Sequence, residues 1–225
     1  MKKISVVLPC LNEENNMKTV VEEIRTIKDY EIEIVIIDNG SIDNSVLLAK
    51  KLGCVVYEEP KKGYGNALRL GNIMCKNEFV IMADCDSTYD LSNLKEFIEP
   101  LEKGYDIVVG NRFKGLKKGS MNLLHYFGNI FLSSLANLFF KTPIKDFHCG
   151  IRSFKKSKIS KLEFKTTGME YATEMIVLAK CNGLNMLEIP TILRKAKYER
   201  KNHLKPFRDG FRHLKVIFKY ALKNQ

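Results

Sequence analysis

The alternation of short apolar runs with segments of helical spacing constrains the fold more than any other feature of this sequence. Residues 12–28 carry apolar side chains at 17, 20, 21, 24 and 27, a spacing that predicts an amphipathic helix after the first apolar run. Strands alternating with helices build βαβ units, which predicts an α/β fold with a parallel, doubly wound sheet. The runs predicted as strands are residues 3–8, 31–38, 55–57, 79–83 and 105–112. The helices predicted between them cover residues 12–28 and 45–52, a segment ending near 75, and residues 93–103.

Two carboxylates, Asp84 and Asp86, directly follow one of these predicted strands. In an open α/β sheet, ligands bind outside the carboxyl ends of the strands, so this pair should face the binding crevice. Hard oxygen ligands suit Mg²⁺ or Mn²⁺, which bind one or two carboxylates together with substrate phosphates and waters. A solvated turn is the alternative, because Asp and Ser are ordinary turn residues. The residues leave both interpretations open, and the first one predicts a metal-bridged diphosphate.

Other polar residues are expected near the same edge of the sheet. The second predicted strand ends at Asp38, and the last one ends at Asn111 and Arg112. The segment KGYGNAL, which begins at Lys62, has glycines for a tight turn before a helix and a cation placed for an anion. The first turn has no GxGxxG motif and the chain has no GxxxxGK[ST] loop, which disfavours NAD and excludes a P-loop ATPase.

Composition narrows the class of protein. The chain of 225 residues is 45% hydrophobic and 28% charged, typical of a globular protein, and no internal repeat forces a split into two domains. The apolar stretch at the N-terminus is too short for a signal peptide and is followed at once by acids, so we expect a cytoplasmic protein. The six cysteines form no CxxC pair, so neither a disulfide framework nor a zinc site is expected.

Basic residues gather near the C-terminus. Residues 193–225 carry eleven Lys or Arg and two acids, so +9 of the formal net charge of +11 lies there. Such a tail can attract nucleic acid or an anionic membrane surface. Nucleic acid is the less expected partner, because the tail lacks interleaved surface aromatic residues and any recognised binding module.

Two segments of the second half are candidates for contact with a membrane. Residues 121–140 are apolar on most faces but are interrupted by a glycine and three polar residues, so they fit a bilayer span poorly. We expect helices near the binding site that touch lipid, with a buried pair of core helices as the alternative. Apolar residues recur every three or four positions from Phe207 to Leu222 between basic ones, which predicts a basic amphipathic helix over 207–225. This helix would lie on an anionic membrane or pack against the domain.

Nine motifs resemble, in order and spacing, those of family 2 glycosyltransferases of the GT-A fold, and together they cover nearly the whole chain. Those of the first half are PCLNEE (9–14), DNGSIDNS (38–45), KGYGNAL (62–68), MADCDSTYD (82–90) and DIVVGNR (106–112). Those of the second half are LLHYFGN (123–129), DFHCGIRSF (146–154), TTGMEYATEM (166–175) and HLKPFRDGFRHLK (203–215). The second set resembles the branch of polyprenyl-phosphate glycosyltransferases similar to dolichyl-phosphate mannose and glucose synthases.

The resemblance implies transfer of a hexose from a nucleotide-diphosphate sugar, of the GDP-mannose or UDP-glucose type, to a polyprenyl phosphate, with inversion at the anomeric carbon. It implies Mg²⁺ or Mn²⁺ on Asp84 and Asp86. A single GT-A domain would comprise a nucleotide-sugar half (1–112), an acceptor half (113–206) and the basic helix. The enzyme would attach peripherally to the inner face of the cell membrane.

Site residues follow from the resemblance motif by motif. Those expected to bind the donor are Pro9, Leu11, Glu13, Asp38, Asn39, Lys62, Gly65, Asp84, Cys85 and Asp86. Those expected to hold the acceptor phosphate are Arg112, His125, Asn129, Lys197 and His203. Those expected at the reacting centre are Asp86, Arg112, Asp146 and Arg152. The chain departs from the family at Leu11, where an aromatic residue is usual, and at Thr88, where Gln is a frequent third metal ligand.

A lipid phosphate suits these residue types. The second pKa of a phosphate monoester is near ~6, so the acceptor is mostly a dianion at neutral pH and needs no general base. It needs positioning, and Arg112 and Arg152 would offset the repulsion between two phosphate-bearing substrates. Asp146, Glu170 and Glu174 would bind sugar hydroxyls or orient Arg152, or else form ion pairs in the core.

Two further functions stay open at this point. Transfer to a hydroxyl of a growing cell-surface polysaccharide would need a general base such as Asp146. A nucleotide-sugar sensor without turnover would keep the donor motifs and tolerate the loss of Arg112.

Overall fold

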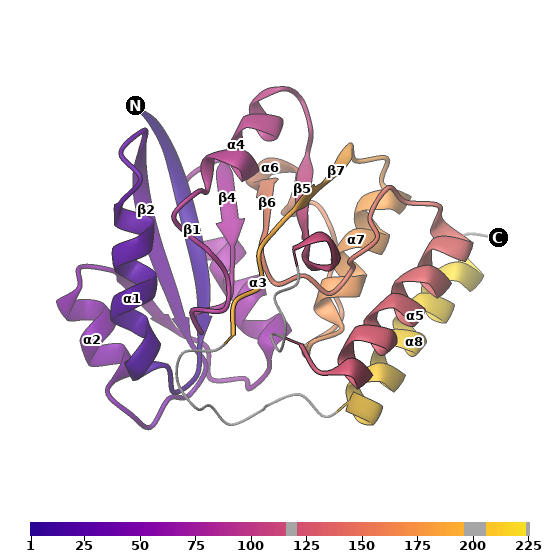
Figure 1. The fold of residues 1–225 in the computed structure, drawn as a ribbon, viewed down its shortest axis with the longest axis horizontal. Coiled ribbons are helices and arrows are strands. Elements are labelled where there is room, and N and C mark those ends of the chain that lie inside the picture. Colours follow the sequence, from indigo (N-terminus) through magenta and orange to yellow (C-terminus); the bar gives the residue numbers. More distant parts are fainter. Residues whose placement is uncertain (116–120, 196–205, 224–225) are drawn as a thin grey trace.

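The computed structural model describes residues 1–115, 121–195 and 206–223. The strands are β1 (Lys2–Cys10), β2 (Tyr30–Asp38), β3 (Val55–Glu58), β4 (Phe79–Met82), β5 (Ile107–Asn111), β6 (Arg152–Lys155) and β7 (Met186–Pro190). The helices are α1 (Glu14–Arg25), α2 (Ser45–Lys51), α3 (Tyr64–Met74), α4 (Lys95–Glu102), α5 (Leu123–Phe140), α6 (Lys156–Ile159), α7 (Tyr171–Cys181) and α8 (Pro206–Lys223), with a short 3₁₀ turn at Arg112–Lys114. Figure 1 shows these helices arranged around a central sheet.

In the described residues the strands form one seven-stranded sheet in the order β3-β2-β1-β4-β6-β5-β7. All neighbouring strands run parallel except β6, which is antiparallel to both β4 and β5. The predicted α/β class with a mostly parallel sheet is therefore confirmed. Strands that precede residue 112 in the sequence and strands that follow it belong to this one sheet, because β6 lies between β4 and β5 and β7 forms an edge.

The centre of the sheet is apolar on both faces. Val6, Val7 and Leu8 are successive apolar residues of β1 that point alternately to the two faces, and none is more than 1% exposed. A strand covered on both sides needs such a run, because alternate side chains point to opposite faces. Helix α3 packs against β1 and β2, and Figure 1 shows α1 on the near side of the sheet. The helical spacing predicted for α1 is confirmed, because its buried residues include Met17, Val20, Val21 and Ile24.

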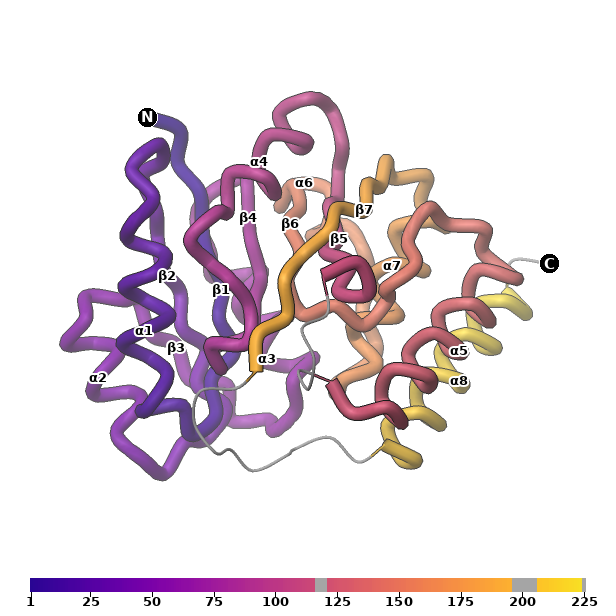
Figure 2. Tube along the Cα trace, in the orientation of Figure 1, coloured from indigo at the N-terminus to yellow at the C-terminus, as the bar shows by residue number. Residues whose placement is uncertain are grey.

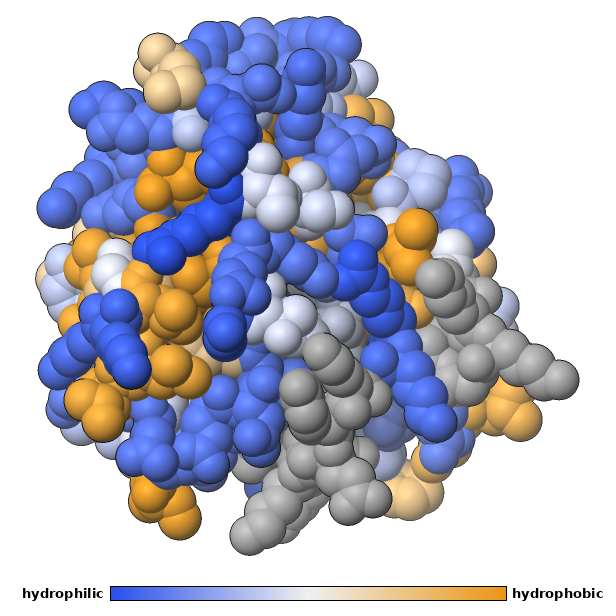
Figure 3. Space-filling view, turned by 60° about the vertical axis from the view of Figure 1, so that its left-hand side comes forward, coloured by the Kyte–Doolittle hydropathy of each residue, from blue (hydrophilic) through white to orange (hydrophobic). Residues whose placement is uncertain are grey.

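Helices α5 and α8 lie side by side at one end of the molecule, away from β1 and β2 (Figures 1 and 2). The ring centroids of Phe139 on α5 and Phe218 on α8 are 5.8 Å apart. Behind them α7 contacts both helices and connects them to the rest of the core. Figure 3 shows a different face of the molecule, on which hydrophilic side chains predominate and apolar groups show between them.

Residues 121–140 contain one helix, α5, rather than the pair of core helices considered from the sequence. Only Leu132, Ser133, Ala136 and Phe140 of this helix are buried. Among the described residues, α5 is the one helix long and apolar enough to span a membrane by length and composition. Its exposed apolar side chains are Leu123, Leu124, Phe127, Phe131, Leu138 and Phe139.

Helix α8 leaves most of its regular apolar stripe uncovered by the core. Phe207, Phe211 and Phe218 are exposed, as is Leu222. Its buried residues are Asp209, His213, Val216, Ile217, Tyr220 and Ala221. Most of the stripe predicted from the sequence is therefore exposed, although Leu214 packs against the core and Phe218 against Phe139 of α5. A second, partly polar face holds the helix on the domain.

Candidate active site

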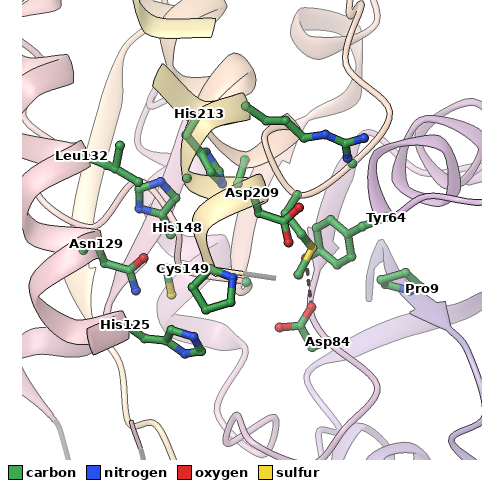
Figure 4. Close-up of a pocket in the computed structure, with 18 of the residues that line it drawn as sticks. Pro9, Tyr64, Asp84, His125, Asn129, Leu132, His148, Cys149, Asp209 and His213 are labelled. Atoms are coloured by element: carbon green, nitrogen blue, oxygen red, sulfur yellow. Dashed lines mark hydrogen bonds between the residues drawn. The ribbon is translucent and has the colours of Figure 1, made fainter. Parts of the chain in front are cut away.

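A cavity of about 940 Å³ lies between the carboxyl ends of the central strands and helices α5 and α8 (Figure 4). Pro9, near the end of β1, lines it on one side, and Asp84, which follows β4, also lines it. His125 and Asn129 reach it from α5, and Asp209 and His213 reach it from α8. Parallel strands place their carboxyl ends together, which is why residues far apart in the sequence meet there.

The two carboxylates predicted as metal ligands both line this cavity. Oδ1 of Asp84 accepts a hydrogen bond of 2.9 Å from the hydroxyl of Tyr64. Oδ1 of Asp86 accepts one of 3.0 Å from the backbone N–H of Thr88 and another from its hydroxyl. Ser87, which lies between Asp86 and Thr88, has a left-handed φ of 60°, a costly conformation for a residue with a side chain. The turn thus directs both carboxylates to one cavity, and Thr88 holds Asp86.

These carboxylates fit a hard divalent cation that is shared with a substrate. In the described residues, no three His, Cys, Asp or Glu side chains are grouped as a metal site. Mg²⁺ and Mn²⁺ do not require such a group, because one or two carboxylates suffice when waters and substrate phosphates complete the coordination. The oxygen donors of Asp84 and Asp86, placed in a cavity with Lys62, are of this type.

The turn before α3 is organised by Asn39, which follows β2. The side-chain amide of Asn39 donates to the carbonyl oxygens of Glu59 and Lys61, at 2.9 and 3.0 Å. Its Oδ1 accepts a 2.7 Å hydrogen bond from the N–H of Gly63. Gly63 has a φ of 139°, and a Cβ there would overlap the carbonyl oxygen of Thr167, so glycine is required. Asn39 therefore sets the position of both Lys62 and the start of α3.

Most residues expected to bind the donor are brought together here. Those that line the cavity are Pro9, Leu11, Glu13, Asn39, Lys62, Asp84, Cys85 and Asp86. Asp38 differs from the expectation, because it is buried and accepts hydrogen bonds from the N–H groups of Gly40 and Ser41, closing the turn after β2. Gly65 also differs, because it lies inside α3 and donates to the carbonyl of Thr167. Both residues shape this end of the cavity without lining it.

Arg112 lines the cavity and is held by Asp146. Its Nε and Nη2 donate to the two carboxylate oxygens at 2.7 Å each, and its backbone N–H donates to the same carboxylate at 3.0 Å. Asp146 is fully buried and does not line the cavity. This bidentate geometry fixes the plane of the guanidinium group, so Asp146 orients Arg112.

Three charged residues of the second half lie in the interior rather than on the cavity wall. Arg152, expected to face a phosphate, is fully buried in β6 and donates to the carbonyl oxygens of Phe147, Cys149 and Ala172. Glu174 accepts from the hydroxyl of Tyr220 at 2.8 Å and from the N–H groups of residues 165 and 166. Glu170 accepts from Gly168 and lies 3.9 Å from Arg212. These contacts hold loops together, and the one ion pair among them joins Glu170 to a partly exposed Arg212 rather than to a partner in the core.

Of the residues expected at the acceptor phosphate, Arg112, His125 and Asn129 line the cavity. Lys197 and His203 lie outside the described residues. Tyr64 and Asp209 also line the cavity but were not predicted as site residues. The four-residue spacing of Asp209 and His213 is a helical-face pattern that could have marked them, but the stronger phenylalanine stripe of α8 obscured it.

Two histidines meet through a threonine at the α8 side of the cavity. Oγ1 of Thr173 lies 2.7 Å from Nδ1 of His213 and 3.3 Å from Nε2 of His148. Burial lowers the pKa of His213 to about 4, although the charge of Asp209 acts in the opposite direction. Burial, followed by the charges of His213 and Arg112, lowers the pKa of His148 well below its ordinary value. Both imidazoles are therefore neutral at neutral pH.

Comparison with known proteins assigns this chain to a family. A sequence model described as glycosyl transferase family 2 matches residues 5–163. The chain is 33% identical over 220 residues to the low-salt glycan biosynthesis hexosyltransferase Agl6 of Haloferax volcanii, covering 95% of this chain but only 52% of that protein. It is 31% identical over 224 residues to the dolichyl-phosphate hexose transferase of the same organism, covering 99% of this chain and 95% of that protein. The chain thus spans about half the length of the first relative and nearly all of the second.

Solved structures support the fold. The crystal structure of glucosyl-3-phosphoglycerate synthase from Mycobacterium tuberculosis with phosphoglyceric acid superimposes with a TM-score of 0.78 at 18% identity, covering 98% of this chain and 80% of that one. A second crystal structure of that enzyme, with Mn²⁺, UDP-glucose and phosphoglyceric acid, gives a TM-score of 0.77 at 17% identity, with the same coverage. The architecture is thus the GT-A type, and from the family match and the relatives together we conclude that this chain is a glycosyltransferase belonging to glycosyl transferase family 2.

Proposed function

We propose that this enzyme transfers a hexose from a nucleotide-diphosphate sugar to a polyprenyl phosphate, with inversion, at the cytoplasmic face of the membrane. One observation carries the proposal. The cavity that holds Asp84 and Asp86 continues between α5 and α8, where the apolar side chains of Phe131, Phe207 and Phe211 line it and are also exposed. A polar end for a nucleotide sugar and an apolar end for a lipid thus belong to one site.

The donor would occupy the end built from β1, β2 and β4. Asp84 and Asp86 would hold Mg²⁺ or Mn²⁺ against the diphosphate, and the ion would stabilise the charge of the departing nucleoside diphosphate. Lys62 lines the same end and adds a cation for the phosphates. The Mn²⁺ and UDP-glucose bound by the structural neighbour support a donor of this class. Residues 1–112 would supply this donor half of a single domain, and residues 113–206 the acceptor half.

The acceptor phosphate would lie near Arg112, with His125 and Asn129 beside it on α5. Asp146 holds the guanidinium group with two hydrogen bonds of 2.7 Å, so Arg112 presents a fixed positive charge to the cavity. A phosphate dianion attacks without a general base, so positioning is the main task of these side chains. The dolichyl-phosphate hexose transferase among the relatives supports a lipid-phosphate acceptor.

The surfaces of α5 and α8 support peripheral attachment to a membrane. Phe127 and Phe131 on α5 are 64% and 61% exposed, and Phe207 and Phe211 on α8 are 86% and 69% exposed. Bulky apolar side chains gathered on two adjacent helices indicate an interaction surface. The basic residues of α8, namely Arg208, Arg212, Lys215, Lys219 and Lys223, would attract anionic lipid headgroups.

Transfer to a sugar hydroxyl is less well supported by the geometry. Such an acceptor must lose a proton, and Asp146 is the base that the sequence offered for this task. The carboxylate of Asp146 is fully buried and engaged by Arg112. It is therefore placed to orient Arg112 rather than to contact an acceptor.

The test is nucleotide release by the purified protein in detergent, with Mn²⁺ or Mg²⁺, across UDP-, GDP- and dTDP-sugars, with and without undecaprenyl phosphate. We expect release that requires the lipid phosphate and is lost in Asp86→Ala. Release that is indifferent to the lipid would refute the acceptor. Donor binding without release from any sugar nucleotide would instead favour a sensor.

A further inference from the structure

We propose that Tyr64 is a positioning residue that, together with Gly150, fixes the carboxylate of Asp84 in the orientation in which it binds the divalent cation. This inference rests on the proposed function, because it assumes a cation at Asp84 and Asp86. Tyr64 belongs to the turn KGYGNAL, in which the sequence drew attention only to the lysine and the glycines. Figure 4 shows its ring beside Asp84, joined to it by a hydrogen bond.

The first contact is the hydrogen bond itself. The hydroxyl of Tyr64 donates to Oδ1 of Asp84 over 2.9 Å. A carboxylate offers about four acceptor positions, so accepting one hydroxyl is compatible with binding a cation as well. The terminal torsion of an aspartate is broad and has no sharp rotamer, so a directional donor is an effective way to fix it.

The second contact is made to the other carboxylate oxygen. A Cβ at Gly150 would overlap Oδ2 of Asp84, so the backbone of this glycine lies directly against the carboxylate. Gly150 is held there by its N–H, which donates to the hydroxyl of Tyr89 over 2.8 Å. Tyr89 is only 2% exposed, so this support is itself part of the core. Asp84 is therefore enclosed between a tyrosine hydroxyl and a glycine backbone.

The support of Tyr64 is as rigid as the support of Gly150. Tyr64 is the first residue of α3, directly after Gly63, whose N–H is held by Oδ1 of Asn39 at 2.7 Å. The next residue, Gly65, donates to the carbonyl of Thr167 at 3.0 Å. The start of α3 is thus tied to two separate loops, which fixes the backbone from which the phenol ring of Tyr64 projects. The two metal ligands are held differently, since Asp86 is fixed by its near neighbour Thr88.

Outer-shell partners of this kind contribute measurably to metal binding. Removing a group that orients a metal ligand typically costs roughly 10–100-fold in metal affinity. Tyr64→Phe deletes only the hydroxyl and keeps the ring, so we expect about a tenfold or greater loss of Mn²⁺ affinity without loss of the fold. Gly150→Ala should act in the same direction, because its methyl group would displace the carboxylate.

The experiment measures Mn²⁺ binding directly, by electron paramagnetic resonance of the free ion, with saturating UDP and in parallel with saturating GDP. The matched control is Tyr220→Phe, because Tyr220 also donates to a carboxylate, that of Glu174 at 2.8 Å, and it does not line the cavity. We expect weaker Mn²⁺ binding in Tyr64→Phe and unchanged binding in Tyr220→Phe. Circular dichroism and thermal unfolding confirm that each variant is folded.

The outcomes separate this inference from the proposed function. Wild-type Mn²⁺ affinity in Tyr64→Phe, with the affinity lost in Asp86→Ala, would overturn the role of Tyr64 and leave the metal site standing. An equal loss in Tyr64→Phe and Tyr220→Phe would also overturn it, because the effect would then be general destabilisation. Unchanged affinity in Asp86→Ala would show that the cation does not bind here, which would overturn the proposed metal site as well.

Discussion

The buried pair His148 and His213 should make the protein sensitive to acid. In the unfolded chain an imidazole has its ordinary pKa of 6.5, whereas burial lowers the pKa of His213 to about 4. Between these values the unfolded state binds more protons than the folded state, so stability falls as pH falls. Since pH 5 lies 1.5 units below the ordinary pKa, protonation of the unfolded state lowers the free energy of unfolding by about 2 kcal/mol for His213 alone.

The assay compares urea unfolding of the wild-type protein and of His213→Asn at pH 7.5 and at pH 5. Asparagine has no proton to bind in this range, so the variant should lose about 2 kcal/mol less stability than the wild type on acidification. His125→Asn is the matched control, since it removes an imidazole from the same cavity and leaves the contact between His213 and Thr173 intact. An equal acid loss in the wild type and His213→Asn would refute the reasoning.

Three other changes test the ion pair, the exposed phenylalanines and the turn before α3. Asp146→Asn leaves the buried guanidinium of Arg112 without its counter-charge, so the free energy of unfolding measured in urea should fall by about 3–5 kcal/mol. Wild-type stability would contradict the structural role of the pair. The double variant Phe127→Ser/Phe211→Ser should remain folded and bind anionic vesicles at least about tenfold more weakly in co-sedimentation. Each exposed ring would add roughly 1.5–3 kcal/mol to the binding free energy on burial in lipid. Undiminished binding would exclude this surface as the membrane contact. Gly63→Ala should lower the midpoint of thermal unfolding. A side chain at a φ of 139° is strained by roughly 1–3 kcal/mol, and its methyl group would overlap the carbonyl oxygen of Thr167. An unchanged midpoint would show that the turn can relax.

The first half of the fold was predictable because its pattern is strong. The apolar runs of β1, β2 and β4 and the spacing of α1 each follow one period over enough residues to be recognised. Strands β6 and β7 were not predicted, because charged residues interrupt their apolar runs and their partners are distant in the chain. Nothing local in Arg152–Lys155 indicates that it pairs antiparallel to β4.

The site was predictable where chain position alone places a side chain, and less so where packing decides. Asp84 and Asp86 follow a strand end and reach the cavity as expected. Asp38 also ends a strand, but its carboxylate closes its own turn, a local competition that the pattern does not reveal. Arg152 sits in a polar motif yet satisfies buried carbonyl groups, because the strand that carries it is central in the sheet. The role of Tyr64 depends on one contact between α3 and β4, which no periodicity records.

The place of β6 in the sheet also dictates the order in which a growing chain can fold. As the polypeptide leaves the ribosome, β4 emerges well before β6, its neighbour on one side. Until Lys155 has emerged, that edge of β4 has no partner, and an unpaired apolar edge is a template for association with other chains. The strand that precedes the carboxylate pair is therefore completed only after α5 has been made, so the part of the cavity around Asp84 and Asp86 cannot mature ahead of the wall formed by α5.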